Sequence, residues 1–204
     1  DPRTLLTLPE REFRAGLAEA VKHGLIADRG YFEWIGAAAD RIAARDLDAL
    51  TELVRRSVAI KAAVVGEDER EAGKRAILNA GHTVAHALEH VSAYALAHGE
   101  AVSLGLVAEA RLAEALGLAE PGLGNQVTEL LARLGLPVTL AKPLPADRVL
   151  SAMAVDKKNR MSAVRFALPT ALGEMHPGEQ WTVAAPPEAI GSALATVGVT
   201  GASS

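Results

Sequence analysis

The apolar residues of this chain are mostly small and aliphatic, which limits the folds they can build. Half of the 204 residues are hydrophobic, but only 3% are aromatic. A core of Ala, Leu, Val and Ile, rich in the first two, favours helices over sheets. Phe13, Leu17, Val21 and Leu25 recur at helical spacing. We therefore expect a mainly α fold, in one domain or a small pair of domains, that buries most of its apolar surface.

The apolar spacing also predicts where the helices lie. They should cover residues 10–28, 31–44 and 47–65, then a stretch from the acidic run 67–69 to about 90, and then 100–116, 122–134 and 145–153. The acidic run 67–69 should begin the fourth helix by complementing its dipole, and Gly117 should end the fifth. Beyond Val155, alternation at 164–168 and 181–183 predicts a small β hairpin, followed by a frayed tail from Val197.

Four polar residues interrupt an apolar segment at helical spacing. Positions 75, 79, 82 and 86 step by four, three and four residues, so an α-helix would place Arg75, Asn79, His82 and His86 on one face. The residues between them are mostly Ala, Ile, Leu and Val, so the helix should be buried on most sides. A buried polar stripe costs free energy unless its members are hydrogen-bonded or bind a ligand.

Two other segments complete a candidate metal site. Glu19 and Lys22 lie three residues apart on a predicted helix and therefore share a face, and His98 lies just before the long apolar helix. Two histidines and one glutamate from separate segments match a ligand set of catalytic zinc, which leaves a coordination position open for substrate or water. The candidate ligands are Glu19, His82 and His98.

The remaining histidines have simpler interpretations, because a single histidine in an apolar helix is more often a core residue than a ligand. That interpretation, or a solvated one, applies to His23 and His176. His90 approaches a predicted helix end, where a cation complements the dipole. His86 lies one turn from His82, so it could be a surface histidine or could transfer protons in the site.

Five cations gather in the segments already singled out. Lys22, Lys61, Arg75, Lys157 and Lys158 are more than a neutral substrate needs, although a single exposed cation is usually only solvated. Lys61 and Arg75 stand among apolar neighbours, and a buried cation requires an anion. The predicted substrate is therefore an anion carrying carboxylate and phosphate groups.

Bulk properties exclude several classes of partner. A net charge of -4 gives no general attraction to nucleic acid or to an anionic membrane. The chain has no cysteine, hence no disulfide or thiolate metal site, and no apolar run of the roughly 20 residues that span a bilayer. We expect a cytoplasmic protein, and a first residue other than Met suggests that it is part of a longer polypeptide.

Taken together, these segments resemble 3-dehydroquinate synthase. The matching pieces are residues 1–2 with 7–9, 16–24, 60–61 with 64–65, 75–86, 98–102 and 156–158, and the likeness extends to about Gly173. It implies that residues 1–204 form the helical C-terminal domain of a two-domain enzyme. The domain that would precede it binds NAD, so the chain alone should be inactive, and the whole enzyme should be a homodimer.

The resemblance also implies a reaction and roles for individual residues. The reaction converts 3-deoxy-D-arabino-heptulosonate 7-phosphate to 3-dehydroquinate and phosphate in the shikimate pathway, with transient hydride transfer to NAD. Glu19, His82 and His98 would hold Zn²⁺ or Co²⁺, and His86 would help to move protons. The residues expected to bind the substrate are Lys22, Lys61, Arg75, Asn79 and Lys157. His23 departs from the family, in which an aromatic residue is more usual.

Three other interpretations remain open. A related sugar-phosphate cyclase would keep the metal ligands and differ in the cations that bind carboxylate; Arg75, Asn79 and Lys61 favour the quinate-forming enzyme. A metal-dependent glycerol or alcohol dehydrogenase would have no use for the phosphate-binding pair Lys157 and Lys158. A helical binding module stabilised by metal, without chemistry, would leave no coordination position open.

Overall fold

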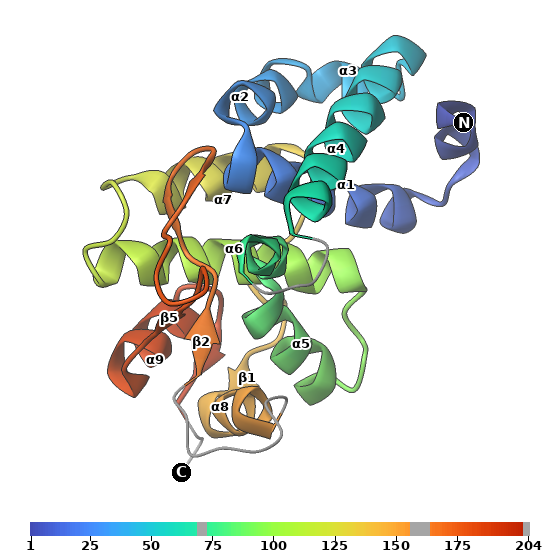
Figure 1. Cartoon of the computed structure of the whole chain (residues 1–204). Helices are drawn as coiled ribbons and strands as arrows, with labels where there is room; N and C mark the ends of the chain where they lie inside the picture. Colours follow the sequence, from blue (N-terminus) through green and yellow to red (C-terminus); the bar gives the residue numbers. More distant parts are fainter. Residues whose placement is uncertain (69–72, 156–163, 202–204) are drawn as a thin grey trace.

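The computed structural model describes residues 1–68, 73–155 and 164–201, and it confirms a mainly α fold (Figure 1). The helical elements are η1 (Pro2–Thr7), α1 (Glu10–Ala27), α2 (Arg29–Ala37), α3 (Ala39–Ala43), α4 (Leu47–Glu67), η2 (Lys74–Asn79), α5 (His82–Val91), α6 (His98–Ala115), α7 (Leu123–Arg133), α8 (Ala146–Val155) and α9 (Pro187–Ala195). In the described ranges no helix is long and apolar enough to cross a membrane.

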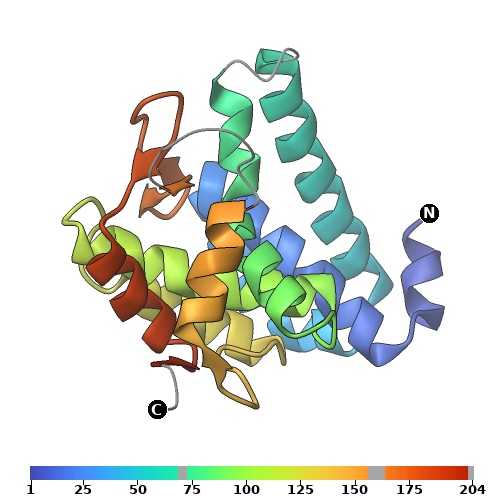
Figure 2. The same cartoon turned by 90° about the horizontal axis from the view of Figure 1, so that it is seen from below.

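Helix α6 is the centre of the molecule. It packs against α1, α5, α7 and α9, and the views of Figures 1 and 2 show these helices around it. Nearly all of its residues from Gly99 to Ala113 are buried, including the polar Ser103 and Glu109. This burial explains the nearly continuous apolar sequence of α6, because a helix that is covered on all sides has no polar face.

Two glycines let α6 approach its neighbours more closely than side chains would allow. A Cβ atom at Gly99 would overlap the backbone carbonyl of Ala15 in α1, and one at Gly105 would overlap the carbonyl of Gly81, just before α5. Neither glycine has a positive φ angle, so the need is for space rather than for an unusual backbone conformation.

The strands are short and form three separate pairs. β2 (Arg165–Phe166) pairs antiparallel with β5 (Val183–Ala184), which confirms the predicted hairpin region. β3 (Pro169–Ala171) pairs antiparallel with β4 (Glu174–Met175), and β1 (Leu144–Pro145) pairs parallel with β6 (Val199–Thr200). The prediction of a frayed tail from Val197 was therefore wrong as far as Thr200, because β6 is paired and Val199 is buried.

Other predicted boundaries were also wrong. Residues 31–44 form two helices rather than one, and the first begins at Arg29 because the Asp28 carboxylate caps it by accepting from Tyr31 N at 2.8 Å. In the described part of the acidic run 67–69 the expected helix start was wrong: α4 continues to Glu67, with Asp68 as its C-cap, and residue 69 lies outside the described residues. Helix α9 was not predicted.

The proposed single helix over 75–90 was wrong in a way that affects the site. Its first part is the 3-10 helix η2, its second part is α5, and Gly81 between them has a left-handed φ of 80°. A continuous α-helix would require a different backbone at Gly81, against which Gly105 of α6 packs. His82, His86 and His90 therefore share α5, whereas Arg75 and Asn79 lie on a separate element.

His23 is a core residue, as the simpler interpretation predicted. It is 5% exposed, and its Nδ1 lies 2.6 Å from Ser57 Oγ, which links α1 to α4. Burial, together with the charge of Lys22, lowers the pKa of His23 to about 4. The ring is therefore neutral at pH 7.

We predict that Gly105→Ala destabilises the protein by roughly 1–3 kcal/mol or more, because its methyl group would enter the backbone of Gly81. Gly16→Ala is the matched control: a Cβ there meets nothing within 4 Å, and the change should stabilise helix α1 by about 0.5–1 kcal/mol. Chemical denaturation measures both. Equal changes in unfolding free energy for the two substitutions would contradict the close contact between Gly105 and Gly81.

The buried His23 should make stability depend on pH. Between pH 6.5 and about 4 the ring is protonated in the unfolded chain and neutral in the folded chain. The contribution of His23 to the free energy of unfolding is therefore fully present above pH 6.5 and is lost on acidification. His23→Phe should reduce the difference in unfolding free energy between pH 7.5 and pH 5.5 by about 1 kcal/mol. Ser57→Ala keeps the His23 ring buried and should retain the difference in unfolding free energy between the two pH values. An unchanged pH dependence in His23→Phe would show that His23 is not its source.

Candidate metal centre

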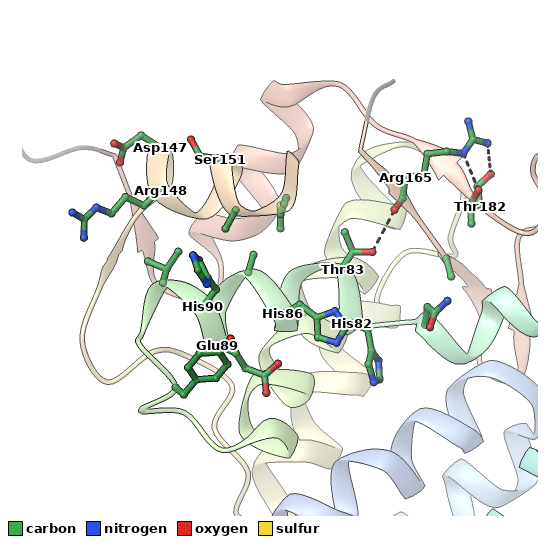
Figure 3. A pocket seen from close by; sticks show the side chains of 17 residues that line it. His82, Thr83, His86, Glu89, His90, Asp147, Arg148, Ser151, Arg165 and Thr182 are labelled. Atoms are coloured by element: carbon green, nitrogen blue, oxygen red, sulfur yellow. Dashed lines mark hydrogen bonds between the residues drawn. The ribbon is translucent and has the colours of Figure 1, made fainter. Parts of the chain in front are cut away.

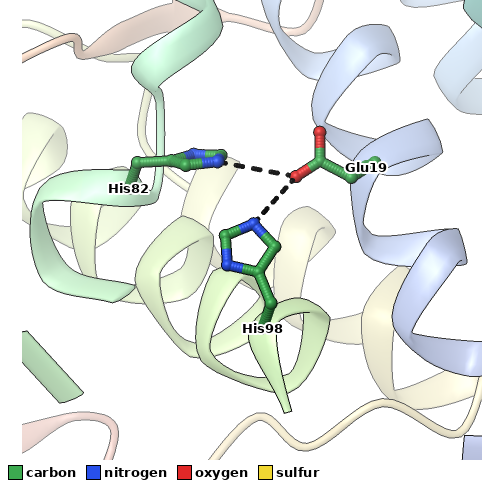
Figure 4. Close-up of side chains that lie close together, drawn as sticks. All are labelled: Glu19, His82 and His98. Atoms are coloured by element: carbon green, nitrogen blue, oxygen red, sulfur yellow. Dashed lines mark ion pairs between the residues drawn. The ribbon is translucent and has the colours of Figure 1, made fainter. Parts of the chain in front are cut away.

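Three side chains from three helices converge on one point (Figure 4). Glu19 lies in the middle of α1, His82 is the first residue of α5, and His98 is the first residue of α6. The Oε1 atom of Glu19 is 3.6 Å from His82 Nε2 and 3.8 Å from His98 Nε2. One ligand atom from each of the three lies within 4.8 Å of the other two. The structure thus brings together the three predicted metal ligands.

Hydrogen bonds on the far side of each ring orient both histidines. Nδ1 of His82 lies 3.1 Å from the carbonyl oxygen of Ala80, and Nδ1 of His98 lies 3.1 Å from Oε1 of Glu89. Carbonyl and carboxylate oxygens only accept, so each Nδ1 donates its hydrogen and each neutral ring keeps a lone pair on Nε2. Both lone pairs face Glu19, as in metal sites whose histidines are held by outer acceptors.

The convergence of three acceptor atoms is unfavourable unless a cation lies between them. Oε1 of Glu19 is buried and has no hydrogen-bond partner among the described residues, whereas Oε2 pairs with Lys22 Nζ at 2.7 Å. A tetrahedral zinc ion with bonds of roughly 2.0–2.2 Å places its ligand atoms about 3.3–3.6 Å apart. The separations of 3.6 and 3.8 Å from Oε1 are close to that range. The residues therefore fit a divalent metal ion.

The electrostatic surroundings favour the ligating forms of these groups. Burial lowers the pKa of His82, and so does the charge of Lys22, so the ring is neutral at pH 7. Burial favours the neutral acid of Glu19, but Lys22 favours the carboxylate, and the pKa of Glu19 lies below its ordinary value. Burial lowers the pKa of Lys22, an effect that the Glu19 carboxylate opposes.

The predicted substrate-binding residues are only partly gathered here. Lys22 is buried, at 4% exposure, directly behind Glu19. Arg75 is half-buried on η2. Lys61 was expected to be buried, which was wrong: it is exposed on α4, although its charge is close enough to act on Lys22. Lys157, with Lys158, lies outside the described residues.

A cavity of about 1040 Å³ opens beside the candidate ligands, between α5, α8 and β2 (Figure 3). Asn79, His82 and His86 line one part of it, and Arg148 and Arg165 line another. Arg165 Nε donates to Thr182 Oγ1 at 2.8 Å, which holds its guanidinium toward β5. The two arginines were not predicted, because they come next to α5 only through the packing of α8 and the β2–β5 pair.

His86 faces this cavity without joining the ligand set. It is exposed one turn after His82, and its ring centroid lies 5.6 Å from that of His82 and 6.4 Å from that of His98. His90, in the last turn of α5, also lines the cavity. His176 is separate: its Nδ1 accepts from Gly178 N at 3.0 Å.

One functional residue that was missed has a signal in the sequence. Glu89 orients His98, and its side chain is only 14% exposed. It lies on α5 seven residues after His82, hence on the same helical face. A carboxylate two turns beyond a candidate ligand could have been recognised as an outer partner.

Comparisons with known proteins agree with this geometry. A family model described as 3-dehydroquinate synthase C-terminal matches residues 16–159. The 3-dehydroquinate synthase of a Synechococcus strain is 46% identical over 178 residues, which are 86% of this chain and 48% of that protein. The enzyme of the same name from Acidithiobacillus ferrooxidans is 47% identical over 174 residues, 85% of this chain and 48% of the relative. The chain thus spans about half the length of these relatives.

Solved structures share the fold. A 2-epi-5-epi-valiolone synthase from Streptomyces hygroscopicus subsp. jinggangensis, with NAD⁺ and Zn²⁺ bound, has a TM-score of 0.82 and 25% identity over 97% of this chain and 54% of its own. A 2-deoxy-scyllo-inosose synthase complexed with carbaglucose-6-phosphate, NAD⁺ and Co²⁺ has a TM-score of 0.84 at 22% identity, covering 95% of this chain and 55% of its own. The family-model match and the curated relatives together show that the chain belongs to the 3-dehydroquinate synthase family.

Proposed function

We propose that this chain is the metal- and substrate-binding part of a 3-dehydroquinate synthase. The whole enzyme would convert 3-deoxy-D-arabino-heptulosonate 7-phosphate to 3-dehydroquinate and phosphate. The observation that carries the proposal is the convergence of Glu19 Oε1 with the Nε2 atoms of His82 and His98, in a chain of this family. A preceding NAD-binding domain, a homodimeric assembly and inactivity of residues 1–204 alone are parts of the same proposal.

The proposed ligands are Glu19, His82 and His98, which leave at least one coordination position for substrate. When bound there, Zn²⁺ or Co²⁺ supplies Lewis acidity to the substrate hydroxyl that NAD oxidises. Lys22 holds Oε2 of Glu19, so that Oε1 stays turned toward the two histidines. Glu89 keeps the hydrogen of His98 on Nδ1 and the lone pair on Nε2.

The residues around the ligands suit an anionic substrate. Lys22, Arg75 and Asn79 would bind its carboxylate, hydroxyl or phosphate groups, and Lys61 and Lys157 are proposed for the same task. Arg148 and Arg165 also line the cavity, together with the acidic Glu89 and Asp147, and Arg165 is paired with Glu179 at 3.0 Å. His86, exposed to the cavity beside His82, would exchange a proton with the substrate through a ring nitrogen.

A related sugar-phosphate cyclase is the second candidate, because the two structural neighbours above carry the names of such enzymes. The identities of 46–47% to curated 3-dehydroquinate synthases favour the first candidate over the cyclase at 25%. Assay of the complete protein with 3-deoxy-D-arabino-heptulosonate 7-phosphate and with substrates of the sister cyclases distinguishes the two.

We predict one Zn²⁺ or Co²⁺ ion per chain after reconstitution, measured by elemental analysis. His82→Ala and His98→Ala should each lose the metal, because two protein ligands do not make a high-affinity site of this type. His176→Ala, which lies away from the three ligands, should retain it. Full metal occupancy in His82→Ala would contradict the proposed ligand set.

In the complete two-domain protein we predict NAD-dependent release of phosphate. His86→Ala should keep its metal but lower kcat by about 10²–10⁴-fold, the range expected for loss of a general acid–base. His176→Ala should turn over at the parent rate. An unchanged kcat in His86→Ala would exclude the proton-transfer role, and absence of phosphate release in the parent would exclude the reaction.

A further inference from the structure

Glu109 is a buried carboxylate that the proposed reaction does not use. It is 1% exposed, in the middle of α6. Its Oε2 accepts from Gly81 N at 2.6 Å and its Oε1 from Val84 N at 3.3 Å, 28 and 25 residues earlier in the chain. A buried carboxylate is costly unless charge and hydrogen bonds compensate it, so its place at this point requires a physical reason.

The reason lies at the start of helix α5. The N-cap residue there is Gly81, which has no side chain to accept from the free N–H groups of the first turn. Glu109 supplies the acceptors from a neighbouring helix instead. Its negative charge also complements the positive end of the helix dipole.

This cap acts on the residue that orients His82. Gly81 lies between Ala80, whose carbonyl oxygen accepts from His82 Nδ1, and His82 itself. The carboxylate of Glu109 therefore holds the backbone segment that carries both the His82 ring and the Ala80 carbonyl oxygen that accepts from it. The close contact between Gly105 and Gly81 keeps α6 near enough for this bond.

Helix α6 repeats the device five residues later, without a metal ligand. Oε1 of Glu114 accepts from Gly122 N at 2.8 Å and from Gly124 N at 3.0 Å. Gly122 is the left-handed N-cap residue of α7, with a φ of 94°, and has no side-chain cap of its own. Since α7 carries none of the three proposed ligands, Glu114 provides a matched control within the same helix.

We propose that Glu109 is a positioning residue that sets the orientation of His82 and thereby the affinity of the metal site. The inference rests on the metal site proposed above and adds to it a carboxylate that touches neither metal nor substrate. Outer partners of metal ligands typically contribute 10–100-fold to metal affinity.

The test measures Zn²⁺ affinity, by competition with a chromophoric chelator, and the visible absorption spectrum of the Co²⁺-loaded chain. Glu109→Gln removes the negative charge and replaces one of the two accepting oxygens by an NH₂ group, which cannot accept from the N–H that faces it. It should weaken Zn²⁺ binding by about 10–100-fold and change the Co²⁺ bands. Glu114→Ala, which removes the acceptor at the start of α7, should lower the thermal stability but keep the parent's affinity and spectrum. Glu109→Asp keeps the charge, withdraws the oxygens by one methylene, and provides the same test if Glu109→Gln does not fold.

The outcomes separate this inference from the proposal on which it rests. A parent chain that binds no Zn²⁺ or Co²⁺ would overturn the metal site and the role of Glu109 with it. A parent chain that binds metal, with unchanged affinity and spectrum in folded Glu109→Gln or Glu109→Asp, would overturn the role of Glu109 alone. Equal loss of affinity in Glu114→Ala would also overturn it, because the effect would then follow from general destabilisation.

Discussion

The close approach of helix α6 to α1 and to the start of α5 is the constraint on which the rest of the structure depends. Gly99 lies against the backbone of Ala15, and Gly105 lies against the backbone of Gly81. His98 directly precedes Gly99 in the chain, and His82 directly follows Gly81. Because packed backbones have little freedom to shift, these contacts determine how far apart the proposed ligands lie.

Polar contacts within the site also orient the proposed ligands. Acceptors outside the ligand set fix both rings, with Ala80 for one histidine and Glu89 for the other, and Lys22 fixes the second oxygen of Glu19. Each of these bonds removes an alternative orientation of a ligand. What remains is a cluster of three acceptor atoms that favours a cation, beside a cavity lined by both acidic and basic side chains.

The sequence predicted which residues form this site better than it predicted which helices carry them. Helical spacing and residue type were enough to select Glu19, His82 and His98, because few residue types ligate a divalent metal and the chain has no cysteine. The same spacing wrongly joined Arg75 and Asn79 to α5, because periodicity does not register a single left-handed residue such as Gly81. The burial of Lys61 was also mispredicted, since apolar neighbours in sequence need not cover a side chain in space.

The sequence by itself determined that the fold is mainly helical, which segments carry the candidate metal ligands, and which family the chain resembles. These follow from local spacing and residue type, which can be read without knowing the packing. Only the tertiary structure showed that Glu109 accepts from the backbone beside His82, that Arg148 and Arg165 line the cavity, and that Gly99 and Gly105 are contact points. Those roles depend on which backbone lies within a few ångströms of another, and this is a property of helix packing rather than of any one segment.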